Sequence, residues 1–187
     1  MVRGFRLKLC LVLLAVLFVV TMQGCGGQTE GANRLVDEAN MIIKELNPKL
    51  RSAQGLIEQG ADYLDVGDIE KGKQSLSAGS ADLDMAISNL KTAKAKYEEA
   101  AALDIGNNHR LYLEAVIRGQ TADIRTTEAL ARMVQLLLAD PAVTNPATSV
   151  EVKALKDELD KQAKLSEEAN AEADRIAAKH ADEFKNS

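Results

Sequence analysis

Residues 68–104 read DIEKGKQSLSAGSADLDMAISNLKTAKAKYEEAAALD, and a seven-residue repeat within them decides the fold class. Large residues recur at one position of the repeat, and small residues recur three positions later. This spacing places both sets on one stripe of a helix and predicts coiled-coil packing against another helix. Glycine and alanine in the stripe should let a partner backbone approach closely. The large residues are Ile69, Leu76, Leu83, Leu90 and Tyr97, and the small ones are Gly72, Gly79, Ala86, Ala93 and Ala100.

Three further segments repeat apolar residues at helical spacing, at about 33–64, 108–139 and from 148 onward. Asn108 is expected to cap the second of them, and Thr148-Ser149-Val150-Glu151 is typical of a capping box at the start of the third. The expected apolar face of the first segment is Leu35, Ala39, Ile42, Leu46, Leu50, Ala53 and Ile57. That of the second is Tyr112, Ala115, Val116, Gly119, Ala122, Ala129, Leu130, Met133 and Leu137. That of the third is Val152, Leu155, Leu159, Ala163, Ala169, Ala173, Ile176 and Phe184.

The four segments have similar lengths and short connections, which favours an all-α, antiparallel up-down-up-down four-helix bundle. Asn47-Pro48 lies inside the first segment, and proline removes a helical hydrogen bond. We therefore expect a kink between Lys44 and Pro48, with a complete break as the alternative. In this topology both ends of the bundle lie at one pole, together with the turn near Ile105.

The first 24 residues have the parts of an export signal. Arg3, Arg6 and Lys8 precede an uncharged run from residue 9 to residue 20, which is too short for a membrane span of about 20 residues. Met22-Gln23-Gly24-Cys25 follows the run. We divide the chain into a signal peptide at 1–24, a linker at 25–32 and one helical bundle domain at 33–187.

Met22-Gln23-Gly24-Cys25 resembles the lipobox of bacterial lipoproteins, in which the cysteine is lipidated and becomes the first residue after cleavage. Gly24 and Cys25 match that pattern, whereas Met22 and Gln23 replace its usual leucine and small residue. The resemblance implies a lipid anchor on Cys25, with more than one acyl chain for stable attachment. Gly26 is not the aspartate that retains such proteins in the inner membrane, so the periplasmic face of the outer membrane is the expected location. The alternatives are a secreted protein with a free Cys25 thiol and an uncleaved signal anchor.

The composition after residue 24 argues against several classes of ligand. The remaining 20 basic and 28 acidic residues give a net charge of about −8, which is unfavourable for binding the phosphates of nucleic acid. Gly67 to Gln74 almost matches a phosphate-binding loop, but Gln74 replaces the required hydroxyl and no strand precedes the motif, so we expect no nucleotide. Cys10 lies in the signal, so no disulfide can form within the mature chain.

Two features remain as candidate sites. Arg118, Arg125 and Arg132 recur every seven residues and form either a solvated, salt-bridged face or a patch for an anion or a partner. The antiparallel register places Arg132 near Asp82, and Arg125 near Asp84. The second feature is Met41 and His180, which occupy heights suited to haem ligation as in small periplasmic b-type cytochromes. Met41 aligns with charged residues, however, so haem is the weaker interpretation.

These patterns predict a membrane-anchored, extracytoplasmic lipoprotein that acts as a non-catalytic scaffold or accessory subunit of a cell-envelope assembly. No nucleophile stands beside a base in a recognisable spacing, so we expect no enzyme, and we expect no cofactor or metal. The expected partners are the membrane, through lipidated Cys25, and a protein of the cell envelope. The alternative function is a carrier whose bundle core holds an apolar ligand, either a lipid or haem.

Overall fold

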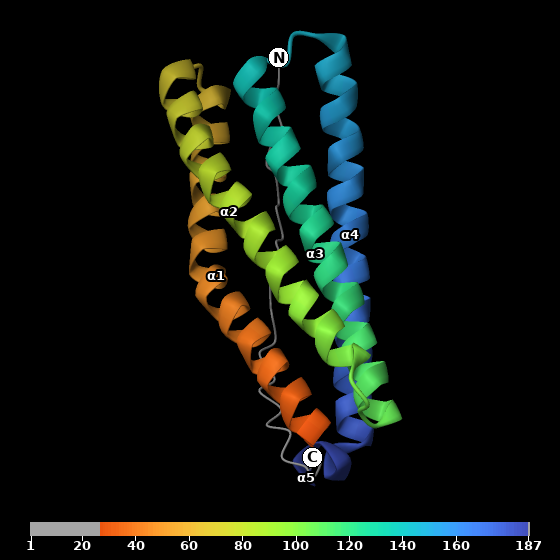
Figure 1. Ribbon diagram of the computed structural model, residues 1–187. Coiled ribbons are helices and arrows are strands. Elements are labelled where there is room, and N and C mark those ends of the chain that lie inside the picture. The colour runs from red at the N-terminus through yellow and green to blue at the C-terminus, as the bar shows by residue number, and fades with distance from the viewer. Residues whose placement is uncertain (1–26, 187) are drawn as a thin grey trace.

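The computed structural model describes residues 27–186, and these form four long helices, one short helix and their connections (Figure 1). The long helices are α1 (Gly27–Asp65), α2 (Ile69–Ala102), α3 (Asn107–Ala139) and α4 (Pro146–Lys179), and the short one is α5 (Ala181–Asn186). Consecutive helices run in opposite directions and pack side by side. The predicted all-α four-helix bundle is therefore confirmed.

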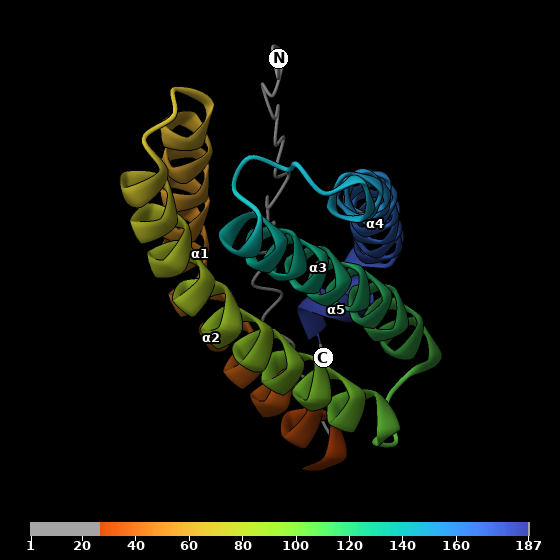
Figure 2. The ribbon, with the colours of Figure 1, turned by 90° about the horizontal axis from the view of Figure 1, so that it is seen from above.

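The helices form two hairpins. Packing is most extensive between α1 and α2 and between α3 and α4, and the contact of α2 with α3 joins the hairpins (Figure 2). In the described residues no comparable packing joins α1 to α4. The start of α1, the turn between α2 and α3, and α5 lie at one end of the molecule (Figure 1). The topology therefore gathers both ends of the described chain at one pole, here called the base.

The heptad stripe of α2 is buried as predicted. Its five small positions and four of its five large positions are buried, and Ile69 is partly buried. Their partners on α1 repeat at the same spacing, because Leu46, Leu50, Ala53, Ile57 and Gly60 are buried as well. Both stripes meet along one seam. The burial of their apolar surface is the main favourable contribution to the free energy of folding of this hairpin.

Glycines bring the two backbones together along this seam. A Cβ atom added to Gly60 would lie 2.7 Å from Leu76 Cγ and 3.1 Å from the Gly72 carbonyl oxygen. A Cβ atom on Gly79 would lie 3.1 Å from the Ala53 carbonyl oxygen. The 2.7 Å contact at Gly60 is closer than a Cβ atom tolerates, and so is the 2.8 Å contact that a Cβ on Gly79 would make with Ile57 Cγ1. Both positions therefore favour residues without a side chain. The small residues close the helix pair rather than leave a space within it.

Polar contacts continue the same register toward the base. The Tyr97 hydroxyl donates to Asn40 Oδ1 at 2.6 Å, and Lys96 forms an ion pair with Glu38. At the opposite end, Gly67 has a positive φ of 83°, and the amides of Gly67 and Asp68 donate to the carbonyls of Leu64 and Tyr63. This pattern is a Schellman motif, which ends α1 and reverses the chain into α2.

α1 is longer than expected and is not broken. It begins at Gly27, so it includes most of the segment expected as a linker, and it continues through Pro48 to Asp65. Figure 1 shows that α1 bends along its length. A proline inside a helix removes one hydrogen bond and commonly bends the axis without ending the helix. The complete break is therefore wrong, and the bend of α1 agrees with a proline inside a continuous helix.

The start of α4 differs from the expected capping box. Asn145 is the N-cap, since its side chain accepts a hydrogen bond from the Ala147 amide at 2.9 Å, and Pro146 is the first helical residue. Proline suits that position because its fixed φ is helical and its missing N–H would have no partner there. Thr148 therefore lies within the first turn. The α4 helix starts three residues earlier than a Thr148 cap would place it.

The base is closed by α5. The chain turns at His180, and Phe184 is buried with its ring centroid 4.5 Å from that of His109 and 5.4 Å from that of Tyr112. Asn108 Nδ2 lies 3.1 Å from His180 Nδ1. Two predictions are wrong here: Gly106, not Asn108, is the N-cap of α3, and Phe184 does not belong to the apolar face of α4.

The seam can be tested by adding a methyl group to each of two glycines of α1. Gly60→Ala should lower the free energy of unfolding by about 1–3 kcal/mol, because the new methyl overlaps Leu76 and the Gly72 backbone. Gly55→Ala is the control, because its added Cβ meets nothing within 4 Å and should stabilise the helix by about 0.5–1 kcal/mol. Urea unfolding measures both, and equal effects of the two substitutions would contradict the close seam.

Candidate docking groove between α3 and α4

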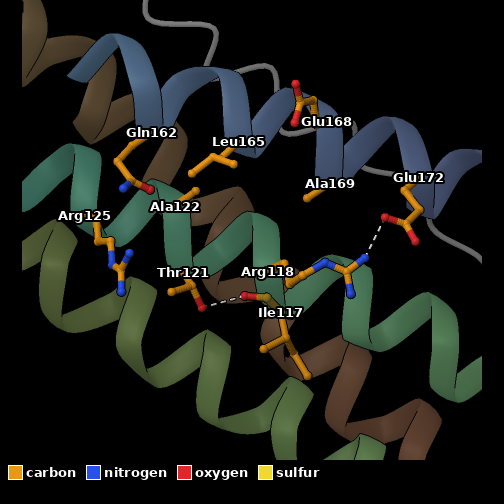
Figure 3. A pocket seen from close by; sticks show the side chains of 10 residues that line it. All are labelled: Ile117, Arg118, Thr121, Ala122, Arg125, Gln162, Leu165, Glu168, Ala169 and Glu172. Atoms are coloured by element: carbon orange, nitrogen blue, oxygen red, sulfur yellow. Dashed lines mark hydrogen bonds and ion pairs between the residues drawn. The ribbon is translucent and has the colours of Figure 1, made fainter. Parts of the chain in front are cut away.

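A groove of about 350 Å³ lies on the outer surface between α3 and α4 (Figure 3). Its side chains are both charged and apolar, and Arg118, Arg125, Leu165 and Glu168 are exposed to solvent. Helix α3 contributes Ile117, Arg118, Thr121, Ala122 and Arg125, and helix α4 contributes Gln162, Leu165, Glu168, Ala169 and Glu172. The groove is therefore a candidate surface for binding another molecule.

Two of the three predicted arginines pair with glutamates of α4. Arg118 Nη2 lies 2.6 Å from Glu172 Oε2, and Arg132 Nε lies 2.8 Å from Glu151 Oε1. The expected α2 partner of Arg132 was Asp82, and that expectation is wrong because Arg132 pairs with Glu151. Arg125 forms no ion pair with the Asp84 expected beside it among the described residues. The side of α3 that meets α2 carries Glu128 instead, which pairs with Lys91 at 2.7 Å. Each pair is about half exposed, so each contributes under about 1 kcal/mol to stability.

Arg125 differs from its two neighbours in the stripe. In the part of the chain that the structure describes, no carboxylate lies within 4.0 Å of its guanidinium nitrogens. Its side chain is exposed and lines the groove (Figure 3). The Thr121 hydroxyl beside it donates to the Ile117 carbonyl at 2.7 Å. Arg125 is therefore a solvated cation at the centre of the stripe.

Helix α4 explains this difference. Its positions facing the stripe follow a seven-residue spacing and are Glu151, Glu158, Leu165 and Glu172. Leu165 interrupts a row of glutamates, and it keeps 42% of its surface exposed. Glu158 is engaged within α4, where it accepts a hydrogen bond from Gln162 Nε2 at 2.7 Å. The groove therefore combines an unpaired cation with an exposed leucine.

The seam beneath the groove is narrow and partly polar. A Cβ on Gly119 would lie 2.9 Å from Asn170 Oδ1 and 3.7 Å from Ala169 Cβ, so α3 and α4 approach closely there. Among the buried residues of α4 are Gln162 and Ser166 as well as Ala169 and Ala173. Only Val152 and Leu159 of α4 belong to the main apolar cluster. Helix α4 is thus held by less apolar burial than α2.

A carboxyl group lies within this seam. Asp123 Oδ1 accepts a hydrogen bond from Ser166 Oγ at 2.7 Å, and Asn170 Nδ2 lies 3.4 Å from the same hydroxyl. Burial raises the pKa of Asp123 to about 6, and the Ser166 hydrogen bond opposes that shift. The charged form is therefore less favourable in the folded protein than in the unfolded chain.

Within residues 27–186, no group of three or more His, Cys, Asp or Glu residues is arranged to hold a metal ion. Met41 is 60% exposed, so its thioether does not point into the bundle core where a haem ligand would have to lie. His180 instead lies beside Asn108 at the base. The two residues considered for haem are therefore not brought together in the core.

The anchor motif lies outside the described residues, as do Cys25 and the whole signal segment at 1–24. Within residues 27–186, no helix combines the length and the apolar character needed to cross a bilayer. Lipidation at Cys25 therefore stays a prediction. The described chain begins two residues after Cys25, already as helix.

Comparison of the chain with models of protein families, with curated proteins and with solved structures finds no match.

Several groove and seam residues were not predicted. The arginine stripe was found by its spacing, but Leu165, Glu168, Asp123 and Ser166 were not singled out. The signal for Leu165 was present, since the spacing of Glu151, Glu158 and Glu172 on α4 mirrors that of the arginines on α3. For Asp123 and Ser166 the sequence offers only polar residues near an apolar stripe. Their burial becomes evident only once the two helices are paired.

The pKa of Asp123 predicts a pH dependence of stability. Its folded value of about 6 lies above the usual 3.8, so the folded state binds more protons between these limits and loses stability as pH rises through them. Asp123→Asn should therefore raise the free energy of unfolding by about 2–3 kcal/mol at pH 7, with little gain at pH 4. Urea unfolding of both proteins at the two pH values measures this. The same gain at both values would show that the carboxyl does not titrate as described.

Proposed function

We propose that the protein is a lipoprotein held on the extracytoplasmic side of a membrane through Cys25, where it acts by contact as a scaffold or accessory subunit of a cell-envelope assembly. The observation that carries the proposal is the exposed groove of α3 and α4, which combines an arginine that has no ion pair with an exposed leucine and lies on a bundle whose α1–α2 seam is closed. The resemblance of residues 22–25 to a lipobox supports the anchor. We favour the periplasmic face of the outer membrane because Gly26 follows the cysteine.

The fold supports a fixed orientation relative to the membrane. Helix α1 starts at Gly27, so a lipid on Cys25 would be only two residues from the base of the bundle. Helix α2 has 34 residues, and a helix of that length spans about 50 Å. The turns at Gly67 and near Asp140 would then face away from the membrane, and the groove would run along the side between the two levels. A partner in the periplasm or on the membrane could reach it.

The bundle core gives less support to the alternative carrier function. A carrier requires space between the helices, and the small residues of the α1–α2 seam were one possible source of it. In the structure these residues bring the backbones into contact, since Cβ atoms on Gly60, Gly72 and Gly79 would overlap their neighbours. An apolar ligand at this seam would have to separate α1 from α2. The outward position of Met41 argues against haem in the same core.

The anchor can be tested with Cys25→Ser in the cells that make the protein. We expect the wild-type chain to sediment with membranes and to carry acyl chains on Cys25 in mass spectra, and we expect the variant to do neither. Crosslinking in the same cells should join the wild-type chain to one reproducible envelope protein, with much lower yield for the variant. A variant that stays on the membrane would contradict the anchor. A wild-type chain that crosslinks to no protein would contradict action by contact.

A further inference from the structure

We propose that the groove between α3 and α4 binds a partner segment that carries an aspartate or glutamate next to an aliphatic side chain. The carboxylate pairs with Arg125, and the aliphatic side chain covers Leu165. This inference rests on the proposed function, because it names the chemistry of the partner that such a contact protein would bind. It commits to a segment of another protein as the occupant.

The first argument is the interrupted row of charges. Arg118 and Arg132 each have a glutamate of α4 within 2.8 Å. In the register of the Arg118–Glu172 pair, the place beside Arg125 is taken by Leu165, and in the register of the Arg132–Glu151 pair it is taken by Glu158, which contacts Lys161 and Gln162 of its own helix instead. No carboxylate of the described residues therefore lies within ion-pair distance of Arg125. A partner that supplies one would form the same charge-assisted pair that the neighbouring layers already contain.

The second argument is the apolar surface beside this cation. Leu165 is 42% exposed, and the groove around it also includes Ile117, Ala122 and Ala169. Figure 3 shows Leu165 between the two helices, with Arg125 toward one end of the groove and the Arg118–Glu172 pair toward the other. An aliphatic side chain placed on Leu165 would exclude water from one side of the Arg125 pair and strengthen it. A volume of about 350 Å³ suits one or two side chains rather than a large ligand.

The charges around the groove argue for a peptide carboxylate rather than for phosphate. Arg118 and Arg125 line the groove together with Glu168 and Glu172, so its cations and anions balance in number. Because Glu172 is paired with Arg118, the remaining charges of the groove are Arg125 and Glu168. Glu168 repels a doubly charged phosphate about twice as strongly as it repels a single carboxylate at the same distance. A single carboxylate needs only Arg125, and the pair also gives the bound segment a defined register.

The experiment places a photo-crosslinking amino acid at position 165 of the full chain, in the cells that make the protein. The matched control carries the same amino acid at Met85 of α2, which has a similar exposed fraction of 44%. Mass spectrometry then identifies the residues joined to each position. We expect position 165, but not position 85, to crosslink to one segment with an aspartate or glutamate within one helical turn of the joined residue.

Charge exchange then tests the named pair. Arg125→Glu should lower the crosslinking yield about ten-fold or more, because a like charge replaces the opposite one, while Arg51→Glu on the exposed face of α1 should leave the yield unchanged. Changing the partner's carboxylate residue to arginine should restore the yield with Arg125→Glu. Leu165→Glu would add a glutamate of this chain at the one position of the α4 row that lacks one. It should lower the amount of partner that a lysine-reactive crosslinker recovers, and it should not lower the free energy of unfolding.

Each other outcome overturns the inference in a recognisable way. A segment without a carboxylate, a second copy of this chain, or an unchanged yield with Arg125→Glu would exclude the named pair. Crosslinks to an envelope protein from Met85 but none from position 165 would exclude the groove and leave the proposed function intact. An absence of crosslinks from both positions, with no partner recovered by the lysine crosslinker, would count against the proposed function itself.

Discussion

Close contact between the backbones of α1 and α2 is the constraint on which the rest of the structure depends. It requires glycine at positions 60, 72 and 79, because a Cβ atom at any of them would overlap the facing helix. It also fixes the register of the hairpin, which places Tyr97 beside Asn40 and Lys96 beside Glu38 nearer the base. With α2 fixed in this way, its other side provides the surface on which α3 packs and through which the second hairpin is attached.

The second hairpin is built differently, and the proposed contact site lies on it. Its seam contains Asp123, Ser166 and Gln162 beside small residues, so it gains less from apolar burial than the α1–α2 seam does. On its outer side, a row of arginines meets a row of glutamates that Leu165 interrupts. An exposed leucine and an unpaired arginine add nothing evident to the stability of the isolated chain. The proposed partner would cover both.

The sequence predicted the fold better than the site, for identifiable reasons. The heptad stripe from 69 to 100 correctly predicted nine buried positions of α2. A seven-residue spacing that persists over five repeats is explained only by one buried face of a helix. Helix starts were predicted less well, since Asn145 and Pro146 compete with Thr148 as the start of α4 and the local signals are similar in strength. The arginine stripe was found, but its partners were assigned to α2. The arginine stripe lies on α3 between the face that packs on α2 and the face that packs on α4. From the sequence alone its side chains could reach either helix, and the packed structure is needed to tell which one they pair with.

The most direct test is amide hydrogen exchange, followed by mass spectrometry, on the protein in membranes from the cells that make it and on the same protein after purification. The account predicts that peptides of α2 exchange most slowly in both samples, because their seam is the tightest. It also predicts that peptides covering 158–172 exchange more slowly in membranes, where the partner covers the groove, than in the purified protein. Equal exchange of 158–172 in the two samples, with new protection on another face, would contradict the claim that this groove is where the protein binds.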